Sequence, residues 1–355
     1  MKPIALIPAA GKSSRYRGDK PKWLRTHPDG RLMLNYAIQS FREIECDIYL
    51  ITTQEIANLY NIQEILNDGC SDLAGIILLE NETSSAIETL VEAIKKFDNL
   101  SLDTPLFVKD CDNFVYFKAD DIDYNESFTI GCDIYSHDIK RITNKSFLVK
   151  NDLGYVIDFV EKRVVSDIIS VGTHYFRSIS LFLNEAMELL AVNDTVGGEK
   201  YISHVIASCI YNGYQFKLID CIKYIDFGTQ EEWDKIQQDH KVLFCDFDGT
   251  LVSNKGRYGN NNWFNRIDEP LIENIKTLKL ISNRGGQIII TTSRCESEKE
   301  YIRNFLSNFS IEIKDIICDC YHSPRYLIND FADTNPYPSC VAINLPRNGS
   351  LSDFF

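Results

Sequence analysis

Short apolar segments of strand length alternate along this chain with segments whose apolar residues recur every three or four positions. Strands that alternate with helices predict an α/β fold with a mainly parallel sheet, because neighbouring parallel strands need long crossover connections. The strand-like runs are residues 4–8, 48–52, 75–79, 106–108, 128–130, 218–225, 242–245 and 287–291, and the clearest helical patterns cover 87–94 and 202–210.

The alternation starts anew near residue 241, after the polar stretch 237–240. A chain of 355 residues, 44% of them hydrophobic, can form two domains with packed cores. We therefore predict two α/β domains, residues 1–238 and 239–355. In both, we expect the functional groups at the carboxyl ends of the strands.

The charge and the cysteines limit the partners that we expect. Acidic residues outnumber basic ones by 51 to 37, which gives a formal net charge of −14. Such a chain repels polyanions, so neither nucleic acid nor an anionic membrane is an expected partner. No stretch has the length of a membrane helix or the pattern of a secretory leader. With 11 cysteines and only Cys318 and Cys320 closely spaced, we expect a cytoplasmic protein with reduced thiols.

A glycine turn follows the first predicted strand. Ala10 and Gly11 let the backbone approach a ligand closely, and turn amides can cradle phosphate. The cations Arg15 and Lys22 come next and could hold the phosphates of a nucleotide. Taken alone, this segment is better interpreted as a tight turn with basic residues on its surface.

Carboxylates follow two further strand-like runs. Asp110 and Asp112 come directly after residues 106–108, and Asp226 follows the run 218–225. Carboxylates from separate segments, together with phosphate oxygens, suit the octahedral coordination of Mg²⁺. The sequence leaves open which of Asp110 and Asp112 would be the ligand.

The order of these motifs resembles the sugar-phosphate nucleotidyltransferases over about residues 1–236. The resemblance rests on Gly11 to Arg15, Pro21-Lys22, Asp110 and Asp112, Glu161-Lys162, the segment from Gly172 to Phe176, Gly198-Glu199 and Asp226-Phe227-Gly228-Thr229. It implies Mg²⁺-dependent attack of a sugar or polyol phosphate on the α-phosphorus of an NTP, with release of pyrophosphate.

The same resemblance assigns roles to the residues that bind the acceptor. Lys162, beside Glu161, would hold the acceptor phosphate, Glu199 would bind a sugar hydroxyl, and Gly172 would line the substrate site. Residues 79–86, where contacts to the base are expected, lack the usual glycine-rich pattern, so the nucleobase stays open.

A second motif, Asp246-Phe247-Asp248-Gly249-Thr250, directly follows the run 242–245. An aspartate at the end of a strand can attack phosphorus, and a second one two residues later can protonate the leaving oxygen. The competing interpretation, a strand that ends in an Asp-Gly turn, fits this specific pattern less well.

This motif resembles the haloacid dehalogenase phosphatases. The resemblance implies that Thr292 binds the phosphoryl group and that Asp246, Asp248 and Asp330 hold Mg²⁺. The neutralising cation would be Arg325 or Lys314. The intervals between the motifs are too short for a large cap domain, so we expect a capless phosphatase.

The sequence thus predicts a bifunctional enzyme acting on an NTP and a sugar or polyol phosphate, with a role in surface polysaccharide synthesis. It leaves room for a homo-oligomer. Two other interpretations stay open. In one, only the phosphatase is active and the N-terminal domain senses a sugar nucleotide. In the other, the phosphatase acts on a phosphorylated protein that the N-terminal domain docks.

Overall fold

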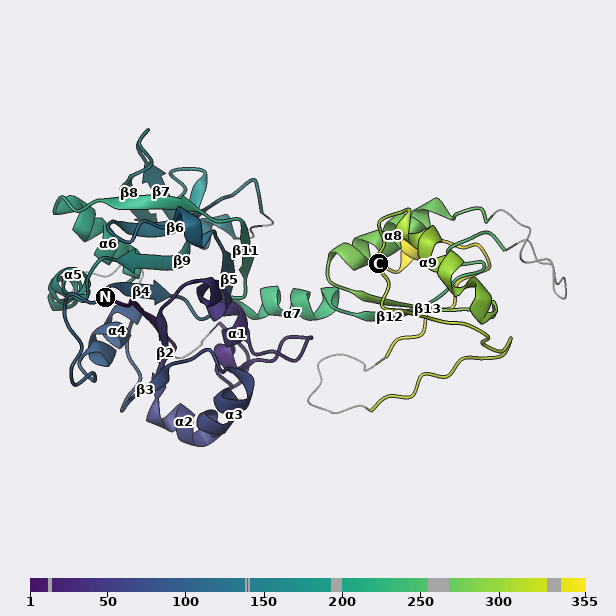
Figure 1. Cartoon of the computed structure of the whole chain (residues 1–355), viewed down its shortest axis with the longest axis horizontal. Helices are drawn as coiled ribbons and strands as arrows, with labels where there is room; N and C mark the ends of the chain where they lie inside the picture. The colour runs from purple at the N-terminus through teal and green to yellow at the C-terminus, as the bar shows by residue number, and fades with distance from the viewer. Residues whose placement is uncertain (12–14, 138, 140, 193–199, 255–267, 331–339) are drawn as a thin grey trace. The chain divides into compact units, whose positions relative to one another are not determined.

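The computed structural model describes residues 1–11, 15–137, 139, 141–192, 200–254, 268–330 and 340–355. The chain divides into two compact units, Met1–Asp234 (unit 1) and Lys235–Phe355 (unit 2) (Figure 1). Our sequence-based boundary, after residue 238, falls within helix α7 (Gln230–Asp239), which continues across this division. Each unit is described by itself.

Unit 1 is built on a mixed, mainly parallel sheet. Its main strands lie in the order β10-β6-β9-β4-β1-β2-β3. Strands β4, β1, β2 and β3 are mutually parallel, as are β10 and β6, whereas β9 runs antiparallel to both of its neighbours. The strands are β1 (Ile4–Pro8), β2 (Asp47–Thr53), β3 (Gly75–Leu79), β4 (Leu106–Lys109), β6 (Ser127–Asp133), β9 (Ile168–Phe176) and β10 (Phe216–Asp220), with β7 (Ser146–Lys150) and β8 (Val156–Glu161) joined beside β9.

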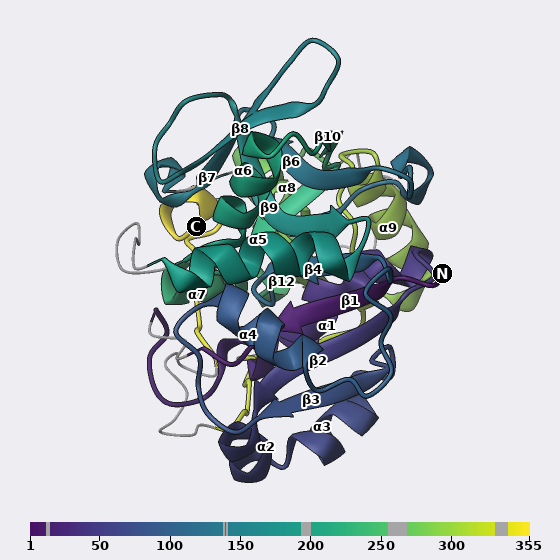
Figure 2. The same cartoon turned by 90° about the vertical axis from the view of Figure 1, so that its left-hand side faces the viewer.

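Helices cover both faces of this sheet, because its central strands are apolar on both sides. In β1, Ile4 and Leu6 belong to one buried cluster, while Ala5 and Ile7 belong to the other. The first cluster is covered by α4 (Ala86–Ile94), α5 (Ile179–Ala191) and α6 (Ile202–Tyr211), which lie in front of the sheet in Figure 2. The second packs against α1 (Met33–Ile38), α2 (Gln54–Tyr60), α3 (Ile62–Gly69), η1 (Lys22–Leu24) and η2 (Gln39–Glu43).

The predicted single run 218–225 is wrong, because it forms parts of two strands with different partners. β10 pairs in parallel with β6, whereas β11 (Lys223–Asp226) pairs antiparallel with β5 (Asn113–Tyr116). The backbone changes partner at the intervening turn. There the N–H of Cys221 donates to Gly131 O (2.8 Å) and that of Ile222 donates to Tyr116 O (2.7 Å). Hydrophobicity continues through this turn, so periodicity alone did not reveal it.

Unit 2 contains a parallel three-stranded sheet in the order β12-β13-β14. Its strands are β12 (Val242–Asp246), β13 (Gln287–Thr291) and β14 (Asp315–Ile317), and its helices are α8 (Ile272–Asn283) and α9 (Lys299–Ser307). Phe247, Leu278, Ile290 and Ile302 form the centre of its core. Residues 321–330 form neither helix nor strand and are exposed.

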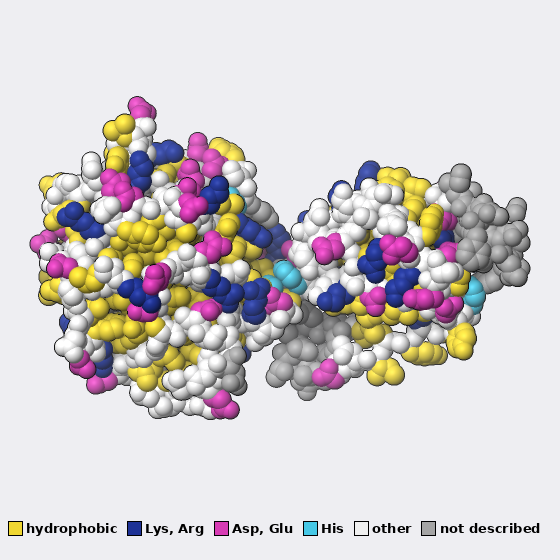
Figure 3. Space-filling model, viewed as in Figure 1, with side chains coloured by type: hydrophobic (Ala, Val, Ile, Leu, Met, Phe, Trp, Pro, Cys, Tyr) yellow, Lys and Arg dark blue, Asp and Glu magenta, His cyan; other side chains and the backbone are white. Residues whose placement is uncertain are grey.

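The remaining short elements are 3-10 turns. They are η3 (Ala119–Asp121), η4 (Ile142–Asn144), η6 (Glu296–Glu298) and η7 (Leu351–Asp353). No helix in the described part of the chain has the length and apolarity needed to cross a membrane. On the visible face of each unit, acidic and basic side chains lie interspersed (Figure 3).

Candidate active sites

The glycine turn and the two cations lie where β1 ends. Ala10 is buried and Gly11 is exposed, and residues 12–14 lie outside the described part of the chain. Lys22 begins η1, which the buried side chains of Trp23 and Leu24 anchor to the core. The position of Lys22 is therefore set by packing, unlike that of Arg15, whose side chain is 65% exposed.

Both cations face Asp112. Lys22 Nζ lies 2.6 Å from Asp112 Oδ2, and Arg15 Nη2 lies 3.8 Å from the same oxygen. Burial by itself would lower the pKa of Lys22, but the Asp112 carboxylate outweighs this and raises it. Burial would raise the pKa of Asp112, but Lys22 and Arg15 hold it below its ordinary value. Asp112 is therefore an anion at neutral pH.

Asp110 has a different environment from Asp112. Burial, followed by the nearby charge of Asp112, raises the pKa of Asp110 to about 6. Its backbone N–H donates to Gly172 O at 2.8 Å. Its carboxylate lies directly over Gly172, since a methyl group added to that glycine would meet Asp110 Oδ2 at 1.9 Å. Gly172 therefore provides the space that Asp110 occupies. Its φ of +64° is a second reason why glycine is favoured at this position.

Lys109, the last residue of β4, supports the turn between these aspartates. Its side chain is fully buried. Nζ donates to the carbonyls of Asp110 (2.8 Å) and Asn113 (3.2 Å), and also to the side-chain oxygen of Asn113. Burial lowers the pKa of Lys109 to about 8. The ammonium group thereby satisfies buried carbonyls that would otherwise lack donors.

Strand pairing brings Asp226 close to Asp112. β11 sets Asp226 opposite Asn113 of β5, and the N–H of Phe227 donates to Asp112 O at 2.9 Å. A methyl group built on Gly228 would lie 3.0 Å from Asp226 Oδ1 and 3.5 Å from Asp112 Oδ2. The two carboxylates therefore converge on one point from different segments.

Lys145 forms an ion pair with Asp226. Both side chains are mostly buried, and burial lowers the pKa of Lys145. Its carbonyl accepts the backbone N–H of Lys162 at 3.0 Å. This lysine follows η4 and belonged to none of the motifs recognised in the sequence.

The predicted acceptor residues Glu161 and Lys162 lie at the end of β8. Glu161 Oε1 accepts the hydroxyls of Ser146 (2.6 Å) and Ser203, so it links β7 to α6. Lys162 has a φ of +53° and is exposed, and its Nζ lies 2.5 Å from the hydroxyl of Tyr201. Glu199 lies outside the described residues.

In unit 2, Asp246 ends β12, and register places it opposite Thr291 of β13. Arg325 Nη2 lies 3.2 Å from Asp246 Oδ1. Burial raises the pKa of Asp246, and the Arg325 guanidinium partly offsets this. Of the two cations that the sequence suggested, Arg325 therefore contacts the predicted nucleophile, whereas Lys314 is exposed just before β14.

Arg294 orients Asp248 from within a buried ionic cluster. Its Nε and Nη2 donate to the two oxygens of Asp248 at 2.9 and 2.8 Å. It also donates to both oxygens of Asp268, at 2.8 and 2.9 Å, and to Glu298 at 3.0 Å. The Arg294 side chain is 2% exposed. This bidentate geometry fixes the plane of the Asp248 carboxylate.

Thr292 and Asp330 are the remaining predicted phosphatase residues. Thr292 is buried, and its hydroxyl accepts the backbone N–H of Arg294 at 3.1 Å. Asp330 is exposed in the stretch 321–330, which has no regular structure.

The donor set of unit 1 fits a magnesium ion. Asp112 and Asp226 supply converging carboxylate oxygens, the ligands that Mg²⁺ prefers, and leave the rest of an octahedron for phosphate oxygens and water. In unit 2, Asp246 and Asp248 supply oxygens next to each other at the end of one strand.

Solved structures share the architecture of the N-terminal part of the chain, over a length that corresponds to unit 1. Unit 1 has the fold of known nucleotidyltransferases. A nucleoside-diphosphate-sugar pyrophosphorylase from Vibrio cholerae matches with a TM-score of 0.56 and 20% identity, over 66% of this chain and 100% of that one. A UDP-glucose pyrophosphorylase in complex with UDP-glucose matches at 0.53 and 14%, over 67% and 98%.

The CTP:phosphocholine cytidylyltransferase of Streptococcus pneumoniae matches at a TM-score of 0.51 and 15% identity, over 67% of this chain and 99% of that one. No family model and no curated protein sequence matches the chain. At these identities, the comparisons establish the fold of unit 1.

Sequence reasoning missed four residues that shape the two sites, namely Lys109, Lys145, Arg294 and Asp268. Lys109 had a signal, since a charged residue ending an apolar strand must find partners when buried. Arg294, directly after the Thr-Thr-Ser segment, had a similar one. Lys145 and Asp268 had none, because only tertiary packing brings them to their partners.

Proposed function

We propose that unit 1 transfers a nucleotidyl group from an NTP to a sugar or polyol phosphate with the help of Mg²⁺, giving an NDP-linked product and pyrophosphate. The observation that carries this proposal is the convergence of two cations and two carboxylates, Arg15, Lys22, Asp112 and Asp226, at the carboxyl edge of β1 and β4. The fold shared with solved nucleotidyltransferases supports it.

In this reaction an acceptor phosphate oxygen forms a bond to the α-phosphorus, and the bond from that phosphorus to the bridging oxygen of pyrophosphate breaks. Lys22 and Arg15 lie where they can bind the triphosphate and the charge that develops on pyrophosphate. The glycine turn at Ala10 and Gly11 would approach the nucleotide, and Lys162 would bind the acceptor phosphate. Magnesium held by Asp112 and Asp226 would supply charge neutralisation.

Asp112 is the better candidate than Asp110 for the metal ligand. It shares the space beside Gly228 with Asp226, and its low pKa keeps it ionised. Asp110 is directed over Gly172, and its raised pKa disfavours the anion. We assign Asp110 the supporting role of shaping the turn that presents Asp112.

For unit 2 we propose hydrolysis of a phosphate monoester. An oxygen of Asp246 would attack phosphorus while Asp248 protonates the departing ester oxygen, and water would then release phosphate from the aspartyl-phosphate. Arg325 beside Asp246 and the fixed orientation of Asp248 support this assignment. Thr292 would bind the phosphoryl group, and Asp330 would complete a magnesium site.

The two activities fit one route to an activated sugar or polyol. The phosphatase would remove one phosphate of a bisphosphate, and the transferase would activate the other. Products of this class supply surface polysaccharides such as capsule or lipopolysaccharide, which is the role we propose.

The deciding experiment uses the Asp246→Asn protein, so that phosphatase action cannot consume substrates or products. It is incubated with Mg²⁺, each of the four common NTPs and dTTP, and a panel of sugar and polyol phosphates. Pyrophosphate and NDP-linked products are then identified by mass spectrometry. We expect one base and one acceptor class to give product, and Asp112→Asn and Asp226→Asn to abolish it. If no pair reacts while nucleotide still binds, unit 1 is a sugar-nucleotide sensor.

A further inference from the structure

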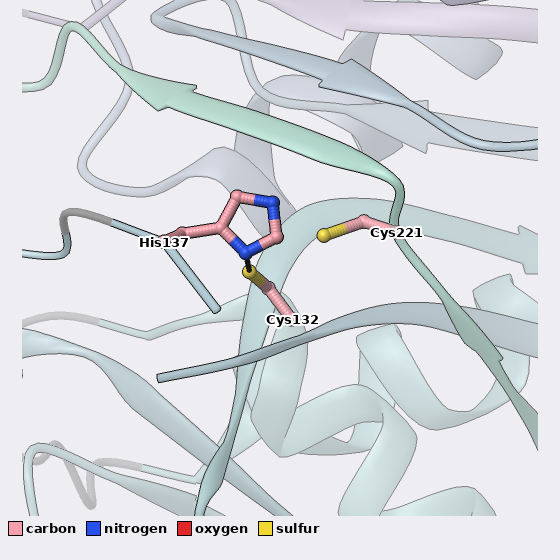
Figure 4. Close-up of side chains that lie close together, drawn as sticks. All are labelled: Cys132, His137 and Cys221. Carbon is pink, nitrogen blue, oxygen red and sulfur yellow. Dashed lines mark hydrogen bonds between the residues drawn. The ribbon is translucent and has the colours of Figure 1, made fainter. Parts of the chain in front are cut away.

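Away from the carboxylates of unit 1, two cysteines and a histidine form a compact cluster. The Sγ atoms of Cys132 and Cys221 and a ring nitrogen of His137 all lie within 4.8 Å of one another (Figure 4). Cys132 Sγ and His137 Nδ1 are 3.0 Å apart. Cys132 is buried, and the other two side chains are half-buried.

The backbone fixes this arrangement. β6 and β10 are parallel neighbours with Gly131 opposite Asp220, so the next residue of each strand, Cys132 and Cys221, comes side by side. A hydrogen bond from the Cys221 N–H to Gly131 O (2.8 Å) continues the pairing. After β6, Asp133 Oδ1 accepts the N–H of Tyr135 at 2.7 Å and turns the chain, and His137 follows that turn.

The histidine is held in the tautomer that a metal ligand requires. His137 Nε2 lies 3.2 Å from the carbonyl oxygen of Ile222, which can only accept a hydrogen bond. Nε2 therefore carries the proton, and Nδ1 directs its lone pair towards Cys132 Sγ, 3.0 Å away. A backbone carbonyl behind the second ring nitrogen is the usual support of a metal-binding histidine.

Two sulfur atoms and one imidazole nitrogen form a donor set that suits a thiophilic metal, to which cysteine binds as the thiolate. The carboxylates of Asp133 and Asp220 flank the pair and add negative charge.

We propose that Cys132, His137 and Cys221 bind a thiophilic divalent cation, Zn²⁺ in the first place. In a tetrahedral zinc site the sulfur atoms lie about 3.8 Å from each other and about 3.6 Å from the histidine nitrogen. The cluster reaches these separations with small side-chain shifts. The three ligands leave a fourth position for water, and their sulfur donors select Zn²⁺ over Mg²⁺.

Such an ion would join two segments that also lead to the candidate active site. Its ligands lie at the end of β6, in the segment that follows β6 on the way to Lys145, and in the turn before β11, which ends at Asp226. Binding of the ion should therefore stabilise unit 1 against unfolding, because a ligand that binds only the folded state adds to its stability. It should also position the Lys145–Asp226 pair.

The test measures metal content and the spectrum of bound Co²⁺. The whole chain is purified under reducing conditions, stripped with a chelator and titrated with Zn²⁺, and then with Co²⁺, in excess Mg²⁺. We expect one tight Zn²⁺ per chain, a sulfur-to-cobalt charge-transfer band, and a rise in melting temperature with Zn²⁺. Cys132→Ser, Cys221→Ser and His137→Gln should each weaken binding by at least about 100-fold, since losing even an outer-shell partner costs about 10- to 100-fold.

Cys46→Ser is the matched control. Cys46 is a half-buried thiol of unit 1 outside the cluster, so this variant should bind like the natural chain. His137→Gln keeps the test valid if a serine variant fails to fold. Three results would overturn the proposal. They are no tight Zn²⁺, a Cys132–Cys221 disulfide in the reduced preparation, or unchanged binding and cobalt spectrum in the folded ligand variants.

Discussion

Replacing Gly172 by alanine tests the packing that places Asp110. The residue has a φ of +64°, where alanine is disfavoured by about 1–2 kcal/mol. The new methyl group would also lie 1.9 Å from Asp110 Oδ2 and 2.5 Å from its Cγ, so the carboxylate must move. Forced repacking of this kind costs about 1–3 kcal/mol. We therefore expect Gly172→Ala to lower the unfolding free energy of unit 1 by about 2–5 kcal/mol.

Gly213→Ala separates the two contributions. Gly213 has a φ of +88°, but a methyl group there would meet no atom within 4 Å, so only the backbone cost of about 1–2 kcal/mol applies. Urea unfolding followed by tryptophan fluorescence measures both variants. Trp23 and Trp233 are buried in unit 1, and Trp263 would be changed to Phe in every protein.

A double-mutant cycle with Asp110→Ala provides the sharpest test, because it removes Oδ2 and Cγ, the atoms that clash. In that background the cost of Gly172→Ala should fall towards the backbone cost of about 1–2 kcal/mol, because only Asp110 Cβ, at 3.0 Å, still crowds the new methyl group. The transferase activity of Gly172→Ala should fall as well, since the turn that presents Asp112 is displaced. Equal unfolding free energies for Gly172→Ala and Gly213→Ala, or strict additivity in the cycle, would refute the reasoning.

Three further outcomes are expected. Lys109→Met should destabilise unit 1, since each buried carbonyl left without a donor costs about 1–3 kcal/mol, and an unchanged urea midpoint would count against this. Because the pKa of Asp110 is raised from 3.8 to about 6, its protonated form stabilises the fold below about pH 4, and this contribution is lost as the pH rises through 6. In EDTA, the melting temperature of the natural chain should therefore fall relative to that of Asp110→Asn between pH 4 and 6. A difference between the two melting temperatures that stays constant over this range would contradict the raised pKa. Arg294→Met leaves buried carboxylates such as Asp248 without their partner, so the unfolding free energy of unit 2 should fall by about 3–5 kcal/mol. Its phosphatase activity should be lost as well. Full activity would show that the orientation of Asp248 by Arg294 is dispensable.

The sequence by itself determined the α/β class and several of the strands, but not β5, β7, β8, β9 or β14. Short apolar runs that alternate with helical patterns favour strands buried between two helical layers, and β1, β3 and β13 have the predicted bounds. It also indicated Asp112 and Asp226, which lie just after or at the end of a strand, and Lys22, which follows the glycine turn after β1. A polar side chain at the end of an apolar strand is a local feature, so its signal is local.

The tertiary structure decided what depends on pairing between distant segments. It divided the run 218–225, because a strand's partner is chosen across the sheet and not along the chain. It distinguished Asp112 from Asp110 through Gly172 and Gly228. It also gathered Cys132, His137 and Cys221, whose spacing resembles no metal motif. Contacts of this kind arise from strand register and close packing, and neither leaves a period in the sequence.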